Sequence, residues 1–494
     1  MTDFDAIVIG AGAVGENVAD RAVQGGLKTA IVEAELVGGE CSYWACMPSK
    51  VLLRSGAVLA TARTVPGARE AITGALDAAA VLRRRTEFTH DWDDDSQVEW
   101  LESAGIELIR GHAVFTGPKT LEVTAADGTV TELTAAHAVA VATGSVAVLP
   151  DIPGLKEAEP WTSREATSAA SVPASLAVIG GGVVAAELAT AFTALGSRVT
   201  VIARGRLLAK QEPFAGEAVA DALTGAGADV RLGTQVERVE TDGSRHTLHL
   251  AGGSTVVAEK ILVATGRAPR TGDLGLDVLG ITPGGWLATD DSMRVLGPDG
   301  QPLDGLYAAG DVTGRALLTH QGKYQARIAG DAMAARASGA PVDTAPWGVH
   351  AATADHAAVP QVVFTNPEVA AVGLTAAEAE RRGIRTRVVD YELGQVAGAS
   401  IHSNGYRGTA RAVVDEDRRV LVGVTFVGPD VGELLHAATI AVAGEVPLER
   451  LWHAVPSYPT LSEVWLRLLE TYGRPRVVAP EPDDPASSAA GSDA

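Results

Sequence analysis

The sequence predicts an α/β fold with two Rossmann-like dinucleotide-binding domains and a third domain of α+β type. Three observations lead to this prediction. A short apolar strand runs into a glycine-rich turn twice, at Gly10 and again at Gly180. The 494 residues exceed what one hydrophobic core usually serves. Beyond about residue 345 the chain keeps helical and strand patterns but shows no further glycine turn of this kind.

The first nucleotide-binding unit begins near the N-terminus with a predicted strand over residues 5–9. A second predicted strand, 29–32, ends at Glu33, where dinucleotide folds place an acid that binds ribose hydroxyls. Between them a turn leads into a helix, whose free N–H groups and dipole favour a pyrophosphate. The turn carries three glycines: Gly10, Gly12 and Gly15.

The second unit repeats this order with a predicted strand over residues 176–179, a turn, a helix and a strand over 199–202. Its turn glycines include Gly180 and Gly182. Two such units in one chain predict two dinucleotide sites. Each unit closes later with a strand followed by Thr-Gly, at 143–144 and 265–266.

The second unit differs from the first at the ribose-binding position. Ala203 aligns with Glu33, so the acid is missing, and Arg204 and Arg206 follow. An acid would repel a ribose 2′-phosphate, whereas guanidinium groups can bind it bidentately. This pattern favours NADPH over NADH; the alternative is two solvated arginines on a loop.

Shifts in pattern predict the domain boundaries. Helices are expected over 57–82, and the acidic, aromatic cluster from Asp91 to Trp100 is interpreted as a solvated helix or loop rather than a site. Strands are expected over 108–141. The predicted domains are 1–150 with 275–345, an inserted domain 151–274, a third domain 346–475, and a disordered tail 476–494 rich in Pro, Ala, Ser, Gly and Asp.

The charge balance excludes some partners. With 40 basic and 61 acidic residues the formal net charge is −21, which argues against nucleic acid and against anionic membranes. No apolar run reaches the roughly 20 residues that cross a bilayer, and the N-terminus enters a strand rather than a signal peptide. We therefore expect a cytoplasmic protein that does not bind membranes.

The chain contains only two cysteines, Cys41 and Cys46, five positions apart. No zinc-ligand pattern lies near them, so no metal site is predicted. In a reducing compartment a close pair is more often catalytic or redox-sensing than structural; two unrelated buried thiols are the alternative. One helical turn would bring the pair within the Cα separation of about 4.4–6.8 Å that a disulfide needs.

The segment from Gly38 to Lys50, in which Pro-Ser-Lys follows the second cysteine, resembles the pyridine nucleotide-disulfide oxidoreductases. Glutathione reductase, dihydrolipoyl dehydrogenase and mercuric reductase belong to that family. Further matching segments occur in the family's order: Gly111-His112-Ala113, Thr143-Gly144, Ala264-Thr265-Gly266-Arg267, Ala309-Gly310-Asp311 and Phe364-Thr365-Asn366-Pro367-Glu368-Val369. The resemblance implies FAD in the first domain, NADPH in the inserted domain, a dimerisation domain, and a homodimer whose subunits share the active site.

The resemblance also implies roles for single residues. Cys46 is the sulfur nearest the flavin and forms the charge-transfer thiolate, while Cys41 attacks the acceptor. Lys50 and Glu187 match an ion pair beside the flavin, for which an ordinary surface pair is the alternative. Asp311 binds the ribityl chain, and His320 is left outside the catalytic set. The other cofactor contacts implied by the motifs are Gly39, Lys50, His112, Ala113, Thr143, Gly144, Gly266 and Gly310.

Three features depart from the family pattern. Family disulfide reductases carry a histidine before Pro-Thr as acid/base from the partner subunit, but here the residue is Tyr458, followed by Glu463 as the expected orienting acid. A phenol is a poor base at neutral pH and a serviceable proton donor. Between the cysteines, Tyr43 and Trp44 replace smaller residues and either line the acceptor pocket or pack in the core. Glu40 replaces a threonine.

The sequence therefore predicts an enzyme that passes electrons from NADPH through FAD and the Cys41–Cys46 disulfide to a small-molecule acceptor, a disulfide or related electrophile. Mercuric reductases use a C-terminal cysteine pair that this chain lacks, so full activity of that kind is not expected. One alternative is an NADPH:quinone or dye reductase (diaphorase) with direct transfer from flavin to acceptor. Another is a flavoprotein that senses NADPH without turnover.

Overall fold

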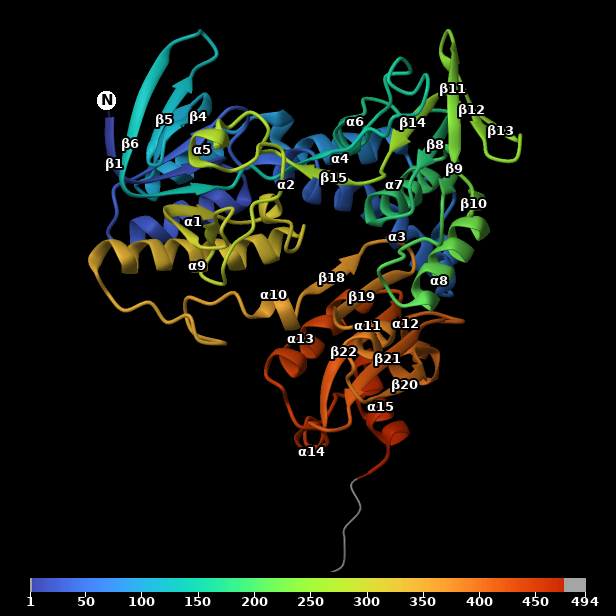
Figure 1. The fold of residues 1–494 in the computed structure, drawn as a ribbon. Helices are drawn as coiled ribbons and strands as arrows, with labels where there is room; N and C mark the ends of the chain where they lie inside the picture. The colour runs from blue at the N-terminus through green and yellow to red at the C-terminus, as the bar shows by residue number, and fades with distance from the viewer. Residues whose placement is uncertain (1, 475–494) are drawn as a thin grey trace, which may run out of the picture.

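The computed structural model describes residues 2–474 and contains three lobes (Figure 1). The predicted tail 476–494 lies outside the described residues. The first lobe is built on an eight-stranded sheet in the order β16-β17-β6-β1-β2-β3, with β4 and β5 continuing from β6. Its strands are β1 (Thr2–Ile9), β2 (Thr29–Glu33), β3 (Glu107–Arg110), β4 (His112–Gly117), β5 (Thr120–Thr124), β6 (Val130–Val141), β16 (Arg294–Leu296) and β17 (Pro302–Ala308).

Strand β1 is buried on both faces, as its continuous apolar run predicts. Ala6 and Val8 point to the face covered by α1 (Ala13–Gln24) and α9 (Thr319–Ser338), which pack against each other. Ile7 and Ile9 point to the opposite face, where residues of β4 and β5 complete a second core. This central strand ends at the first glycine turn, so the turn is held by a rigid core on both sides.

The second lobe repeats the arrangement. Its parallel sheet has the order β10-β9-β8-β14, so the first strand of the unit lies between the second and the last, as β1 lies between β2 and β6. A three-stranded antiparallel sheet, β11-β12-β13, packs beside it. The elements are β8 (Ser175–Ile179), α7 (Val183–Ala194), β9 (Arg198–Ala203), α8 (Pro213–Gly225), β10 (Asp229–Leu232), β11 (Val236–Asp242), β12 (Arg245–Leu250), β13 (Thr255–Ala258) and β14 (Lys260–Val263).

Two chain segments connect these lobes. β7 (Ser145–Ala147) leaves the first lobe and β15 (Arg267–Pro269) returns to it, and the two pair as antiparallel strands. The short helix α6 (Ser163–Ser168) lies on the outgoing segment before β8. In Figure 1 β15 and α6 lie between the two upper lobes.

The third lobe, orange to red in Figure 1, contains a five-stranded antiparallel sheet in the order β18-β19-β22-β21-β20. Helices α13 and α15 pack on it around Phe426. The predicted fold class is thereby confirmed. The elements are β18 (Pro360–Val363), β19 (Glu368–Gly373), α11 (Ala376–Arg381), β20 (Thr386–Glu392), α12 (Ala397–His402), β21 (Thr409–Asp415), β22 (Val420–Gly428), α13 (Leu435–Ala443), α14 (Leu448–Leu451) and α15 (Val464–Tyr472); α10 (Ala354–Ala357) precedes them.

Two expectations for the region between the repeats need correction. The helical stretch expected over 57–82 is interrupted: α3 (Cys46–Thr64) ends before Pro66-Gly67, and α4 (Ala78–Phe88) begins where the Asp77 side chain accepts the Ala80 N–H at 3.0 Å. Proline and glycine terminate helices, and aspartate caps them. The cluster 91–100 contains the start of α5 (Asp95–Ser103) and is not simply solvated, because Asp94 is 9% exposed. No helix within residues 2–474 combines the length and apolarity required to cross a membrane.

Candidate active site

The two cysteines lie on different helices. Cys41 belongs to α2 (Gly39–Tyr43), and Cys46 is the first residue of α3. An unbroken helix would place residues five apart about 140° from each other around its axis, so their sulfurs would diverge. Instead the backbone leaves the helical region at Trp44 (φ −135°) and Ala45 (φ −132°). The expectation that one helical turn supplies the spacing is therefore wrong; a break between two helices supplies it.

Thr319, the first residue of α9, joins the two sulfurs. Its Oγ1 lies 3.1 Å from Cys46 Sγ and 3.4 Å from Cys41 Sγ. The sequence analysis missed Thr319, although it stands beside His320, which was considered. His320 itself places Nε2 2.8 Å from the Pro360 carbonyl and holds the third lobe, which fits its exclusion from the catalytic set.

The surroundings stabilise negative charge on Cys46 rather than on Cys41. The hydrogen bond from Cys41 is the main reason that the pKa of Cys46 is lowered to about 6, against the opposing effect of burial. The Thr319 hydrogen bond and the charge of Lys50 lower this pKa further. The amino end of α3 also favours a thiolate, because it is the positive end of the helix dipole. The pKa of Cys41 is raised, because its thiol bonds to Cys46 and is buried.

Lys50 and Glu187 form an ion pair that joins all three lobes. Lys50 Nζ lies 2.8 Å from Glu187 Oε2, and Glu187 is only 3% exposed. The other oxygen of Glu187 accepts the Phe364 N–H at 3.0 Å, and Lys50 lies 5.1 Å from the centre of the Phe364 ring. The pair therefore joins α3, α7 and the start of the third lobe through a buried Glu187 and a half-buried Lys50, unlike the ordinary surface pair considered as the alternative.

The first glycine turn leaves no room for a side chain at Gly10 or Gly15. A Cβ at Gly15 would lie 1.8 Å from the Gly10 carbonyl oxygen, and Gly10 itself has φ +97°. Glu33 braces the turn: its Oε2 accepts the Ala11 N–H at 2.6 Å and its Oε1 accepts the Glu35 N–H at 2.8 Å. Burial raises the pKa of Glu33.

A second carboxylate, Asp311, follows β17 on the other side of the turn. Ser145 Oγ donates to Asp311 Oδ2 at 2.5 Å, and Arg267 Nε donates to Ser145 Oγ at 2.6 Å. Burial raises the pKa of Asp311. Helix N–H groups flanked by two half-buried carboxylates form the donor and acceptor set that binds a dinucleotide's pyrophosphate and sugar hydroxyls, so these residues fit FAD.

The remaining predicted contacts of the first site lie along neighbouring strand ends. Thr143 Oγ1 donates to the Arg270 carbonyl at 2.7 Å, and Gly144 adopts φ +72°. Ala113 is buried within β4. His112 is directed to Asp273, with Nε2 3.2 Å from its carbonyl oxygen, so the His112 side chain is occupied within the protein.

The second glycine turn precedes α7, and Gly182 is the residue before that helix. Arg204 is exposed and makes no hydrogen bond to any residue within 2–474. Arg206 instead donates to the carbonyl oxygens of Ala209 (2.8 Å) and Gln211 (3.1 Å), so it braces its own loop. The two arginines that were expected to act together therefore differ: Arg204 is free of internal hydrogen bonds within residues 2–474, and Arg206 is not.

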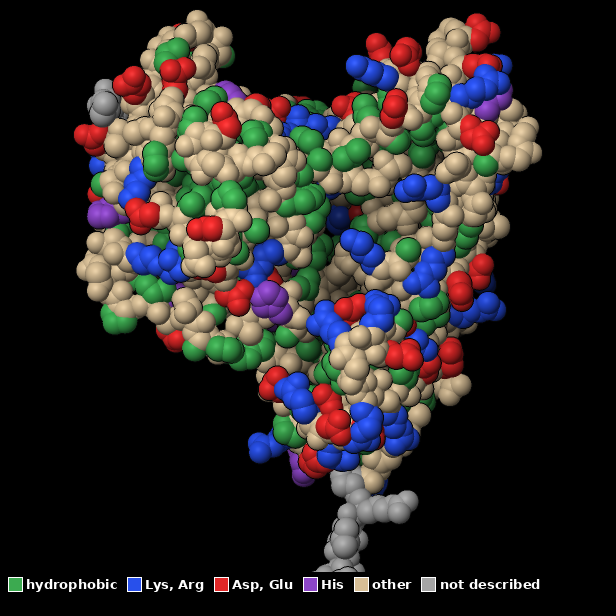
Figure 2. Space-filling view, in the orientation of Figure 1, with side chains coloured by type: hydrophobic (Ala, Val, Ile, Leu, Met, Phe, Trp, Pro, Cys, Tyr) green, Lys and Arg blue, Asp and Glu red, His purple; other side chains and the backbone are tan. Residues whose placement is uncertain are grey.

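Figure 2 shows a hollow between the upper lobes with Lys and Arg side chains around it, despite the acidic net charge.

Tyr458 and Glu463 lie in the third lobe and are not joined by a hydrogen bond. Tyr458 is 77% exposed. Glu463 accepts from Arg467 at 2.6 Å, one helical turn further along, and from the Ala397 N–H at 3.3 Å. The expectation that Glu463 orients Tyr458 is therefore not met within one subunit, because Arg467 holds the carboxylate.

Tyr43 packs in the core rather than facing an acceptor. It is 2% exposed, and its hydroxyl donates to the Asp93 carbonyl at 3.1 Å. Trp92 Nε1 donates to the Tyr43 carbonyl at 3.2 Å. Asp94 accepts the Val37 N–H at 2.7 Å, so the 91–100 segment supports the loop that carries the cysteines.

Comparison with known protein families gives two matches that together span most of the chain. Residues 4–336 match the model named pyridine nucleotide-disulphide oxidoreductase, and residues 359–468 match the dimerisation domain of the same group. These matches confirm the resemblance inferred from the cysteine segment.

Individual relatives span nearly the whole chain. A mercuric reductase of Staphylococcus aureus is 32% identical over 468 residues, covering 93% of this chain and 81% of that protein. A dihydrolipoyl dehydrogenase of Chlamydia muridarum is 31% identical over 474 residues, covering 94% and 95%.

Solved structures show the same fold. The Cu(II) complex of the HOCl-induced flavoprotein disulfide reductase RclA from Escherichia coli has a TM-score of 0.80 at 23% identity, covering 95% of this chain and 99% of that one. LpdA from Mycobacterium tuberculosis has a TM-score of 0.77 at 24% identity, with the same coverage.

Proposed function

The chain belongs to the pyridine nucleotide-disulphide oxidoreductase family, and from this premise we propose that it is an NADPH-dependent flavoprotein reductase acting through Cys41 and Cys46. Its acceptor, on this proposal, is a disulfide or a related small electrophile. The observation that carries the proposal is the meeting of the two sulfurs at Thr319, with the charge of Lys50 favouring a thiolate on Cys46. The cytoplasm suits such a pair because thiols are kept reduced there.

The cofactor sites follow from the two glycine turns. Glu33 and the turn at Gly12 would hold the adenosine and pyrophosphate of FAD, and Asp311 its ribityl chain. The turn at Gly180 would hold NADPH, with Arg204 on the 2′-phosphate. Bound FAD supplies the relay that takes two electrons from NADPH and delivers them to the cysteine pair.

The cysteines then divide the reaction with the acceptor. Cys41 loses its proton as its sulfur forms a mixed disulfide with one acceptor sulfur, the acceptor S–S bond breaks, and the first acceptor thiol leaves with that proton. The Cys46 thiolate then attacks the Cys41 sulfur, the Cys41–Cys46 disulfide reforms, and the second acceptor sulfur leaves as a thiolate that takes up one proton. Each turnover consumes one NADPH and one proton and releases two thiols.

The second acceptor thiolate needs a proton donor, and we assign this role to Tyr458 of a second subunit. Its 77% exposure leaves the hydroxyl accessible, and apolar neighbours such as Val455 (85% exposed) support burial of this face in a homodimer. A phenol can donate this proton but accepts one poorly near pH 7.

That limitation favours one second candidate, an NADPH:quinone or dye reductase. In that reaction the acceptor takes electrons directly at the flavin, so no thiol has to be protonated by Tyr458. Cys41 and Cys46 would then store electrons without contacting the acceptor.

One set of assays separates the two functions. Wild type, Cys41→Ser and Tyr458→Phe are each assayed for NADPH consumption with a disulfide and with a quinone, and Ser42→Ala serves as the matched control beside Cys41. A disulfide reductase loses disulfide turnover in Cys41→Ser and slows by roughly 10²–10⁴ in Tyr458→Phe. If wild type turns over only the quinone, and both variants match it, the disulfide proposal is wrong.

A further inference from the structure

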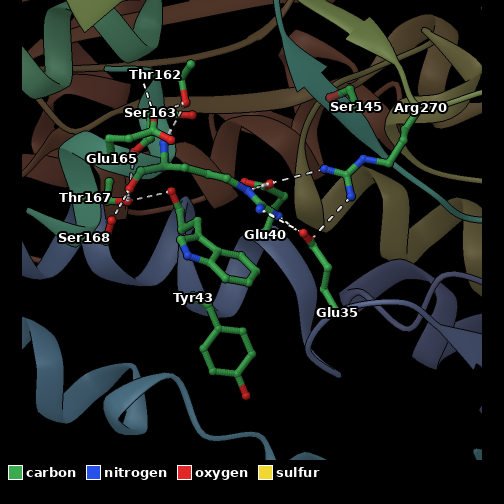
Figure 3. A network of polar contacts seen from close by, with 12 residues as sticks. Glu35, Glu40, Tyr43, Ser145, Thr162, Ser163, Glu165, Thr167, Ser168 and Arg270 are labelled. Carbon is green, nitrogen blue, oxygen red and sulfur yellow. Dashed lines mark hydrogen bonds and ion pairs between the residues drawn. The ribbon is translucent and has the colours of Figure 1, made fainter. Parts of the chain in front are cut away.

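Two side chains of α6 contact Trp44 in the loop between the two cysteines. The Arg164 guanidinium lies 4.0 Å from the centre of the Trp44 ring, a distance at which cation–π attraction operates. The same guanidinium bonds to Glu40, the residue before Cys41, and to Glu35 at 2.6 Å. Figure 3 shows this network, with Arg270 approaching Glu40 and Glu35 from the side opposite α6.

A second contact from α6 is made to the backbone of this loop, at the Trp44 carbonyl. Pro48 lies in the first turn of α3, where a backbone N–H has no acceptor within the helix, and the Trp44 carbonyl precedes that helix. The Thr167 hydroxyl lies 2.8 Å from this carbonyl, slightly closer than its distance of 2.9 Å from the Ser163 carbonyl within its own helix. Thr167 therefore supplies a hydrogen bond to a carbonyl that lies between the two helices.

Helix α6 is itself firmly anchored. Arg85 of α4 is 2% exposed and donates to the carbonyl oxygens of Thr167 and Ala169, the latter at 2.9 Å. Thr162 and Glu165 form a capping box at the start of the helix. Arg164 and Thr167 thus project from a short helix whose two ends are fixed.

Trp44 is the residue at which the chain leaves α2, and this break brings the sulfurs together. The two contacts from α6 therefore act on the conformation that the redox pair requires. Arg164 is also chemically suited to the task, since a planar guanidinium can stack on an indole and bond two carboxylates at once, which an ammonium cannot.

We propose that Arg164 and Thr167 are positioning residues of the redox centre, which hold the break at Trp44 so that Cys41 and Cys46 both stay at the Thr319 hydroxyl. This inference rests on the proposed function only in taking Cys41 and Cys46 as the redox pair. Loss of these contacts lets Cys41 move away from Cys46 and Thr319, and protonation of Cys46 then becomes easier.

The measurement is the midpoint of Cys46 ionisation in the NADPH-reduced holoenzyme, from the pH dependence of its alkylation by iodoacetamide. The thiolate absorbance band provides a second reading. Arg164→Gln is expected to raise the midpoint by about one unit, a tenfold change in the thiol-to-thiolate ratio. Arg164→Lys should raise it less, and Thr167→Val should raise it in the same direction.

Arg270→Gln is the matched control. Arg270 reaches the same carboxylates, 3.6 Å from Glu35 and 3.7 Å from Glu40, but among the described residues it makes neither a cation–π contact nor a hydrogen bond with Trp44. Its removal should leave the midpoint unchanged. An unchanged midpoint in folded Arg164→Gln overturns the inference, and so does a shift in Arg270→Gln equal to that in Arg164→Gln. If Arg164→Gln does not fold, an unchanged midpoint in Thr167→Val overturns it. Absence of any Cys46 thiolate in wild type overturns the proposed function instead.

Discussion

Replacing Arg204 by alanine tests whether the second nucleotide site selects NADPH. Ala203 ends β9 without a carboxylate, and Arg204 is exposed beside it with no internal hydrogen bond in residues 2–474. A hydrogen bond to a charged group contributes about 1.5–3 kcal/mol, and solvent exposure places Arg204 at the low end. About 1.4 kcal/mol corresponds to a tenfold change. Arg204→Ala should therefore lower kcat/KM for NADPH about tenfold and leave kcat/KM for NADH nearly unchanged.

Arg206→Ala is the matched control, because its guanidinium is bonded to the Ala209 and Gln211 carbonyl oxygens of its own loop. Its loss should loosen the loop and affect both coenzymes alike. Steady-state kinetics with both coenzymes at low and high salt is the assay, since screening should shrink only the effect that depends on the 2′-phosphate charge. The reasoning fails if wild type uses NADH as efficiently as NADPH, or if Arg204→Ala lowers both efficiencies equally.

Two further predictions concern Lys50 and Glu187. Lys50→Met should raise the pKa of Cys46 above its value of about 6, because the Lys50 charge lowers that pKa, so the thiolate band of the reduced protein should appear at higher pH. Cys46→Ser should abolish the band and retain FAD. A band unchanged in either variant would contradict the assignment of the thiolate to Cys46. Glu187→Gln should lower the same pKa, because the Glu187 charge raises it, and should cost about 1–2 kcal/mol of unfolding free energy by leaving Lys50 without its counter-charge. The first effect is read by titration and the second by thermal unfolding; a rise in pKa would refute the first, and an unchanged Tm the second.

The nucleotide-binding units could be predicted because their determinants are local. A tight turn such as the one at Gly10 needs glycine, and the strand before it is apolar because it is buried on both faces. The absence of an acid at Ala203 could also be predicted from the sequence, because aligning the two repeats places Ala203 at the position of Glu33. The spacing of Cys41 and Cys46 before Pro-Ser-Lys was sufficient for the family.

The sequence could not show which distant residues the fold brings to these local features. Thr319 reaches the sulfurs only because the eight-stranded sheet places the start of α9 beside α3. Whether Arg206 faces a coenzyme or its own loop depends on a backbone path that no short motif specifies.

By itself, then, the sequence determined the two glycine turns, the cysteine pair and the absence of an acid at Ala203, all of which depend on residues a few positions apart. The tertiary structure alone decided that Thr319 lies between the two sulfurs, that Glu187 is buried against Lys50, and that Arg164 contacts the Trp44 ring. The physical reason is that burial and long-range hydrogen bonds set these properties, and both arise only when segments more than a hundred residues apart pack together.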